Sequence, residues 1–300
     1  MGNRFELCIL TDNEAEAAAC IDAGVKEIQR IEKLLTTFSE TSQTNEINRM
    51  AGIQPVHVDR EIFDIIKRSI RISDLTQGAF DITYGSMDKR LWNFDQHMTS
   101  LPDVAKAKKL VRLINYRNIV LDEKAGTVFL KEKGMRIGFG GIGKGYAADR
   151  AKQIMKEQGV TSGIVNASGD LIVWGHQADG KPWTIGIADP NAVQHPFSYL
   201  NITDKAIATS GTYEKFVTIN GKKYSHTIDP KTGYPVSGIK SVTIISPHAE
   251  LSDALATPVM VMGVNVGLDL INQMDNVSCI IIDDHNKLFT SRNIRITSSL

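Results

Sequence analysis

A glycine-rich segment, residues 138–149 (GFGGIGKGYAAD), contains the residue types best suited to chemistry in this chain. Glycines let backbone N–H groups approach a phosphate closely, and Lys144 adds an ammonium at the start of a predicted helix. We interpret the segment as a binding loop for a nucleotide or another phosphorylated ligand. A glycine-rich turn without a ligand is the alternative.

Two known phosphate-binding patterns fit this segment only in part. Gly138, Gly140 and Gly143 have the spacing of the dinucleotide fingerprint, but that fold needs an acid about 20 residues later, and Asp170 lies further on in a turn. The P-loop needs a Ser or Thr after its lysine, where this chain has Gly145. A nicotinamide-dependent dehydrogenase is therefore an alternative that rests on glycine spacing alone.

A carboxylate and a hydroxyl in a later predicted helix could complete such a site. Asp253 and Thr257 are four residues apart, so they share one face of a helical turn. Oxygen ligands of this kind suit Mg²⁺, which also binds substrate phosphates. The simpler interpretation is that Asp253 is an acid favoured near a helix N-terminus.

Three further polar segments interrupt apolar sequence. Residues 78–83 (GAFDIT) place an acid between apolar residues, and residues 166–170 (NASGD) indicate a tight turn, for which a structural role is slightly favoured. Residues 224–233 (YSHTIDPKTG) put a histidine at the exit of a predicted hairpin. His226 is the histidine with an acid nearby, so it could accept a proton near neutral pH.

The composition excludes some classes of partner. Lys plus Arg equals Asp plus Glu, 34 each in 300 residues, which argues against nucleic acid or an anionic membrane surface as the main partner. Cys8, Cys20 and Cys279 are widely spaced among apolar residues, and we expect them to be small core residues.

Hydrophobic periodicity predicts an α+β fold with an antiparallel or mixed sheet. Asp59 is expected to cap the second helix, and Gly159 to end the helix after the glycine-rich loop. Neither repeats nor low-complexity linkers interrupt the chain, so one continuous domain over residues 1–300 is predicted. Helices are expected at 12–35, from 59, after the loop to 159 and from 251, and strands at 4–10, 119–121, 128–130, 163–166, 171–174, 183–187, 216–224, 241–245, 277–282 and 287–290.

A series of short motifs in a fixed order resembles the ApbE family of FAD:protein FMN transferases, from residue 1 to about residue 290. The motifs are residues 1–3 (MGN), 37–39 (TFS) with 45–48 (NEIN), 78–83 (GAFDIT) with 91–92 (LW), 143–149 (GKGYAAD), 166–170 (NASGD), 207–211 (IATSG), 226–230 (HTIDP) and 253–257 (DALAT).

The resemblance implies an ApbE-type α+β fold and Mg²⁺-dependent transfer of FMN from FAD to a Thr or Ser hydroxyl of a target protein, with release of AMP. A FAD pyrophosphatase that gives FMN and AMP, or a non-catalytic FAD-binding protein, is the alternative. His226 matches the proposed base, and Lys144 with magnesium would neutralise phosphate charge. The matching metal ligands are Gly141, Asp253 and Thr257, and the matching FAD contacts are Met1, Phe38, Ala79, Phe80, Asp81, Lys144 and Ile228.

The resemblance also implies partners and a location. The partners are FAD and an acceptor flavoprotein, expected to be a respiratory redox subunit. The expected location is the extracytoplasmic or periplasmic face, membrane-associated through a lipid anchor absent from this chain; the cytoplasm is the alternative. The chain departs from many members at Gly138 (Asp), Phe38 (Tyr) and Ala256 (a second Asp in some).

Overall fold

A computed structural model describes residues 4–87, 100–101, 103–189, 192–212, 216–219, 222–225 and 227–294. Its chain forms two compact units. Unit 1 consists of Met1–Glu32, Ile142–Tyr213 and Gly238–Leu300, and unit 2 of Lys33–Gly141 and Glu214–Ser237. The prediction of one continuous domain stays a prediction.

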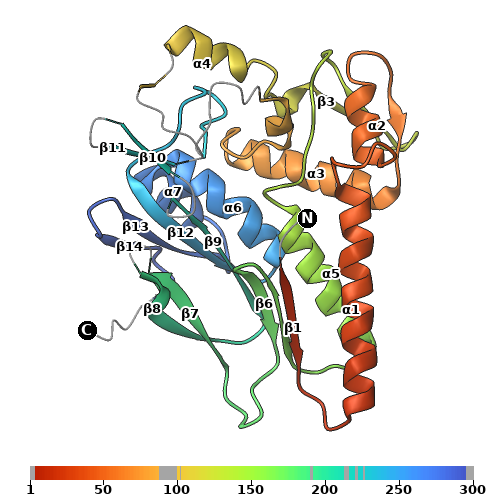
Figure 1. Ribbon diagram of the computed structural model, residues 1–300, viewed down its shortest axis with the longest axis vertical. Helices are drawn as coiled ribbons and strands as arrows, with labels where there is room; N and C mark the ends of the chain where they lie inside the picture. Colours follow the sequence, from red (N-terminus) through yellow and green to blue (C-terminus); the bar gives the residue numbers. More distant parts are fainter. Residues whose placement is uncertain are drawn as a thin grey trace. The chain divides into compact units, whose positions relative to one another are not determined.

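Unit 1 is built on a seven-stranded sheet in which every neighbouring pair of strands is antiparallel (Figure 1). Because every pair is antiparallel, this sheet contains no βαβ unit, so the dinucleotide-fold alternative is wrong. The strands in spatial order are β1 (Phe5–Ile9), β5 (Gly163–Ala167), β6 (Asp170–Trp174), β9 (Lys205–Gly211), β12 (Ile239–Ser246), β13 (Ser278–Asp283) and β14 (Leu288–Thr290).

Different elements cover the two faces of this sheet. Side chains alternate along each strand, so neighbouring residues face opposite sides. Ile172 and Ala206 face a core that includes Ala148 and Ala249, whereas the adjacent Val173 and Ile207 face the β7–β8 hairpin. Helices therefore cover one face and a two-stranded ribbon the other (Figure 1). The elements of unit 1 outside the sheet are α1 (Glu14–Leu35, ending in unit 2), α5 (Gly143–Glu157), α6 (Ala249–Met262), α7 (Val264–Ile271), β7 (Trp183–Asp189) and β8 (Ala192–Ile202).

Unit 2 combines short helices with a small sheet, β2–β4–β3, and a separate hairpin, β10–β11. The amphipathic helix α3 buries Ile62, Ile65 and Ile66. The elements are α2 (Gln43–Arg49), α3 (Arg60–Leu75), α4 (Val104–Leu110), the 3₁₀ helices η1 (Ile82–Ser86) and η3 (Tyr116–Asn118), β2 (Val56–His57), β3 (Ile119–Asp122), β4 (Thr127–Leu130), β10 (Phe216–Ile219) and β11 (Lys222–Ser225).

Most predicted elements are present, and one detail of the prediction is wrong. Asp59 is the N-cap residue of α3 as expected, but its side chain makes no capping bond, and its carboxylate accepts the Gln43 side-chain amide at 2.7 Å. Cys8 is exposed on the edge strand β1, whereas Cys20 and Cys279 are buried as expected. Among the described residues, no helix has the length and apolar character needed to cross a membrane.

Candidate functional site

Helices α5 and α6 of unit 1 approach each other at Gly145. A Cβ atom there would lie 2.1 Å from the carbonyl oxygen of Ala249, so only glycine allows this crossing. One turn later, the Asp149 carboxylate accepts the N–H groups of Ala249 at 3.0 Å and Glu250 at 2.9 Å. Asp149 thereby satisfies two free donors at the start of α6 and fixes this end of the helix against α5.

The crossing brings Asp253 to the N-terminus of α5. Its side chain is buried, with the residue 7% exposed, and its Oδ2 atom accepts the Gly145 N–H at 3.0 Å. The pKa of this carboxyl is raised to about 7, first by burial and then by the charge of Asp170, while Lys144 and the amides of Gly145 and Lys144 lower it. A buried carboxylate in this position requires compensating positive charge.

Lys144 and Asp170 form an ion pair within the same cluster. Asp170 is 4% exposed because it begins β6, directly after the tight β5–β6 turn in which Ser168 and Gly169 have positive φ. The charges of Asp170 and Lys144 both act on Asp253, the first raising and the second lowering its pKa. Two carboxylates this close to each other favour a nearby cation.

Thr257 supplies a hydroxyl on the same helix as Asp253. Its Oγ1 atom lies 3.0 Å from Oγ of Ser210 on β9. Carboxylate and hydroxyl oxygens suit Mg²⁺, and no group of three or more His, Cys, Asp or Glu side chains that could hold a metal exists among the described residues. The residues present therefore fit a hard cation with few protein ligands better than a site for zinc.

In unit 2, Phe38 stands on a loop that is firmly held. Its side chain is 94% exposed. The Asn45 side-chain amide donates to the carbonyl oxygens of Thr37 at 2.8 Å and Ser39 at 2.7 Å, and the Ser42 hydroxyl also donates to Ser39. An exposed aromatic ring on a pinned loop is available for stacking on a planar ligand.

The first part of the glycine-rich segment also belongs to unit 2. The Asn48 side chain exchanges two hydrogen bonds with the backbone of Ile137, and Gly138 N–H donates to the carbonyl of Ile82. A Cβ atom at Gly141 would lie 3.7 Å from the ring of Phe80. Phe80 and the neighbouring Ala79 are buried, at 7% and 6% exposure.

Asp81 has a structural role in unit 2. Its Oδ1 atom accepts the N–H of Thr83 at 2.8 Å and the hydroxyl of Thr83 at 2.6 Å, and its Oδ2 atom accepts the N–H of Tyr116 at 2.8 Å. Burial raises the pKa of this carboxyl, and the bonds from Thr83 and Tyr116 oppose the change. Asp81 therefore fixes the segment around residues 79–83, where FAD contacts are predicted.

Three other residues are predicted to belong to the site: Ile228, Met1 and His226. Ile228 is 1% exposed and packs with Met87, Ala107 and Val111, so its predicted contact with FAD stays a prediction. Met1 and His226 lie outside the described residues. The structure thus groups Lys144, Asp253 and Thr257 in unit 1, and Phe80 with Gly141 in unit 2.

Sequence reasoning missed two residues of the unit 1 cluster. Asp170 was interpreted as part of a structural turn, and Ser210 had no assigned role. The continuous apolar run that follows Asp170 in residues 170–174 (DLIVW) contained a signal for the first, because a strand buried on both faces also buries its first side chain. An acid buried there needs a cationic partner.

The crossing at Gly145 gives a stability prediction. We expect Gly145→Ala to lower the free energy of unfolding by at least about 1–3 kcal/mol, the usual cost of overpacking, because the new methyl group meets backbone rather than a movable side chain. Denaturant unfolding measures the change. Gly140→Ala is the matched control, since a Cβ atom there meets nothing within 4 Å; equal stability of both variants would contradict the close crossing.

Comparison with known proteins identifies the family. The ApbE family model matches residues 1–281, and the chain belongs to the ApbE family. A FAD:protein FMN transferase of Klebsiella pneumoniae (strain 342) is 32% identical over 301 residues, which cover 100% of this chain and 92% of the relative. The FAD:protein FMN transferase of Treponema pallidum (strain Nichols) is 29% identical over 309 residues, with 96% and 84% covered.

Solved structures agree with the fold. The crystal structure of the ApbE protein of Thermotoga maritima has a TM-score of 0.85 at 30% identity and covers 97% of this chain and 94% of its own. The flavin transferase ApbE of Vibrio cholerae has a TM-score of 0.84 at 24% identity, covers 97% and 94%, and supports the fold alone. The predicted α+β, ApbE-type fold is confirmed.

Proposed function

We propose that this protein is a FAD:protein FMN transferase that uses Mg²⁺ and esterifies FMN to a Thr or Ser hydroxyl of an acceptor protein. Family membership supports the transferase activity. The observation that carries the metal assignment is the Asp170–Lys144–Asp253 cluster, in which two buried carboxyl groups lie close enough for their charges to interact. The Ser210–Thr257 hydroxyl pair adds oxygen ligands of the right kind.

The transfer breaks a phosphoanhydride bond of FAD and forms a phosphoester bond to the acceptor. The acceptor hydroxyl oxygen attacks the phosphorus on the FMN side of the pyrophosphate, the bond to the bridging oxygen breaks, and AMP leaves with that oxygen. The hydroxyl proton passes to a base, for which His226 is our candidate. Without charge neutralisation and a placed nucleophile, this displacement is slow.

Asp253 and Thr257 of unit 1 would hold Mg²⁺, and the third predicted ligand, the backbone oxygen of Gly141, is proposed on the family motif alone. When bound, the metal neutralises charge on the phosphoryl oxygens. Lys144 would direct its ammonium to the pyrophosphate, and Asp170 would keep that ammonium in place, since the two are paired. Gly145 donates its N–H to Asp253 and so orients the carboxylate.

The ring systems of FAD need apolar and aromatic contacts. Phe38 offers an exposed ring on a loop held by Asn45, which lowers the entropic cost of ordering it on binding. Ala79, Phe80 and Ile228 complete the proposed set of contacts in unit 2 on the family motif. Met1 is proposed on the family motif alone.

A direct assay tests the proposal against its alternatives. The protein is incubated with FAD, Mg²⁺ and a candidate acceptor, and we expect AMP release together with a fluorescent acceptor band in a denaturing gel. AMP without a flavinylated acceptor would indicate a FAD pyrophosphatase. Binding of FAD without any AMP would indicate a non-catalytic binding protein and would contradict the proposal.

Lys144 is tested by comparing two ligands. We expect Lys144→Ala to weaken FAD binding more than FMN binding, because its ammonium meets the pyrophosphate, and Lys144→Arg to restore binding only in part. Fluorescence titration measures both affinities, with Lys152→Ala on the same helix as the control. Equal losses for FAD and FMN would remove Lys144 from the phosphate site.

The proposed partners are FAD and an acceptor flavoprotein, with a respiratory redox subunit as the candidate. The proposed place of action is the extracytoplasmic face of a membrane. Both proposals follow from the family resemblance, and mass spectrometry of acceptors recovered from periplasmic and cytoplasmic fractions of a producing cell tests them. Flavinylation confined to cytoplasmic proteins would contradict the location.

A further inference from the structure

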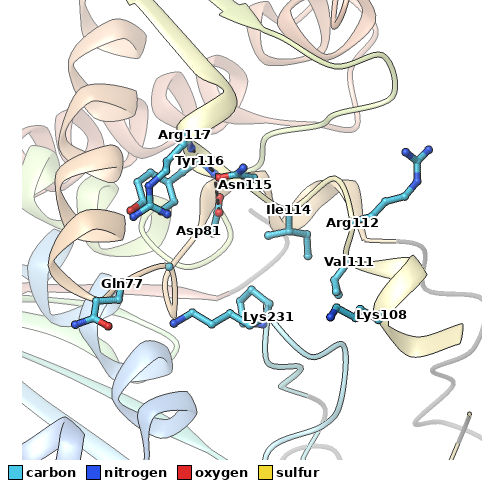
Figure 2. Close-up of a pocket in the computed structure, with 12 residues that line it drawn as sticks. Gln77, Asp81, Lys108, Val111, Arg112, Ile114, Asn115, Tyr116, Arg117 and Lys231 are labelled. Atoms are coloured by element: carbon cyan, nitrogen blue, oxygen red, sulfur yellow. Dashed lines mark hydrogen bonds between the residues drawn. The ribbon is translucent and has the colours of Figure 1, made fainter. Parts of the chain in front are cut away.

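Unit 2 contains a pocket of about 370 Å³ whose charge is strongly one-sided (Figure 2). Four cationic residues line it: Lys108, Arg112, Arg117 and Lys231. The one acidic lining residue is Asp81. Because the whole chain has no net charge, this pocket is a local surplus of positive charge.

The cations come from separate elements. Lys108 is in the last turn of α4, Arg112 follows that helix, and Lys231 extends from another loop to within reach of Gly78 (Figure 2). No carboxylate of the described residues forms an ion pair with these three side chains. Arg117 stacks its guanidinium 4.6 Å from the centre of the Tyr116 ring.

Asp81 does not neutralise the rim of the pocket. It is buried at 8% exposure, and its two oxygens accept three hydrogen bonds from Thr83 and Tyr116. Both of its oxygens therefore accept hydrogen bonds that hold unit 2 together. The exposed cations at the rim remain available to an anionic ligand.

The backbone of four residues that line the pocket offers no free N–H group to a phosphate. Phosphate sites use free N–H groups, often at a helix N-terminus. Here the N–H groups of Asn115, Tyr116 and Arg117 are already donated to Thr83, Asp81 and Asn115, respectively. The Lys231 N–H is donated to Asp229. Helix α4 contributes Lys108 from its C-terminal turn, where carbonyl groups face outward.

We infer that this pocket binds carboxylate side chains on the surface of the acceptor protein. Spaced, exposed ammonium and guanidinium groups steer and align an acidic protein surface, which is how charge complementarity directs protein partners. The inference rests on the proposed transferase function, which supplies the protein partner. It adds a recognition surface made of unit 2 residues, of which Asp81 is also a predicted FAD contact.

The test uses a fluorescently labelled decaglutamate peptide and the full chain. Anisotropy should show binding to the wild type, weakening as salt is raised to about 0.15 M. The triple variant Lys108→Gln/Arg112→Gln/Lys231→Gln should bind about tenfold more weakly, the scale of three exposed charge pairs. The control Lys106→Gln/Lys109→Gln/Lys124→Gln removes the same charge in unit 2 from residues that do not line the pocket, and should bind as the wild type does.

Several results would overturn the inference. Equal loss of peptide binding in the triple variant and the control would mean that net charge alone is responsible. Displacement of the peptide by AMP or inorganic phosphate would make the pocket a nucleotide or phosphate site. AMP release from FAD by the wild type is measured in parallel. If the peptide does not bind but AMP is released, the inference about the pocket is wrong, whereas the proposed transferase function is not contradicted.

Discussion

Replacing Asp253 with asparagine should lower Mg²⁺-dependent AMP release from FAD by at least about 100-fold. Loss of an outer partner of a metal ligand alone costs 10–100-fold, so loss of a ligand should cost more. Asparagine is preferred to alanine because Asp253 is buried and accepts the Gly145 N–H at 3.0 Å. Alanine would leave that donor unsatisfied, at a cost of about 1–3 kcal/mol.

Two measurements separate loss of the metal from loss of the fold. The wild type should gain thermal stability when Mg²⁺ is added, since a ligand that binds the folded state stabilises it, whereas Asp253→Asn should not respond. Glu250→Gln, which removes a carboxylate from the same helix, is the matched control. Unchanged Mg²⁺ affinity and AMP release in Asp253→Asn would make the metal assignment wrong.

Local sequence signals predicted elements in both units. The apolar repeat over residues 12–35 and the strand patterns at 119–121 and 128–130 depend on neighbouring residues, and the structure contains α1 at Glu14–Leu35 and the β3–β4 pair. Helix α5 ends at Glu157, and Gly159, two residues later, has the positive φ of +91° expected of a glycine that stops a helix. Such signals act within a few residues, so they are readable from one sequence.

Elements stabilised by distant contacts were missed. The strand β9 (Lys205–Gly211) pairs with β6 and β12, and α7 (Val264–Ile271) follows α6 without an interval long enough to suggest a new helix. β8 (Ala192–Ile202) is an irregular partner of β7. The stability of these segments comes from partners that a single sequence does not place beside them.

In the candidate site, too, features set by neighbouring residues could be predicted and features set by distant contacts could not. Asp253 and Thr257 could be paired from helical spacing, because four residues make about one turn. The link from Lys144 to Asp170 depends on the β5–β6 turn and on the α5–α6 crossing, and neither leaves a short-range pattern. The burial of Ile228 could not be predicted either, because it depends on packing with residues more than a hundred positions away.

His226 gives the second large prediction, although it lies outside the described residues. A threonine hydroxyl is a poor nucleophile at neutral pH and needs a base within hydrogen-bond reach. Metal-bound water has its pKa lowered by the cation and depends less on such a base. We therefore expect His226→Ala to reduce FMN transfer to an acceptor by about 10²–10⁴-fold, and FAD hydrolysis by less.

The pH profile distinguishes a base from a positioning residue. Transfer by the wild type should fall on acidification, because an imidazole is protonated below a pH of about 6.5 and then cannot accept the hydroxyl proton. The assay scores flavinylated acceptor by gel fluorescence and AMP by chromatography, with His57→Ala, an exposed histidine of unit 2, as control. Undiminished transfer in His226→Ala would exclude the base role, whereas equal losses of transfer and hydrolysis would mean that His226 positions FAD or the metal.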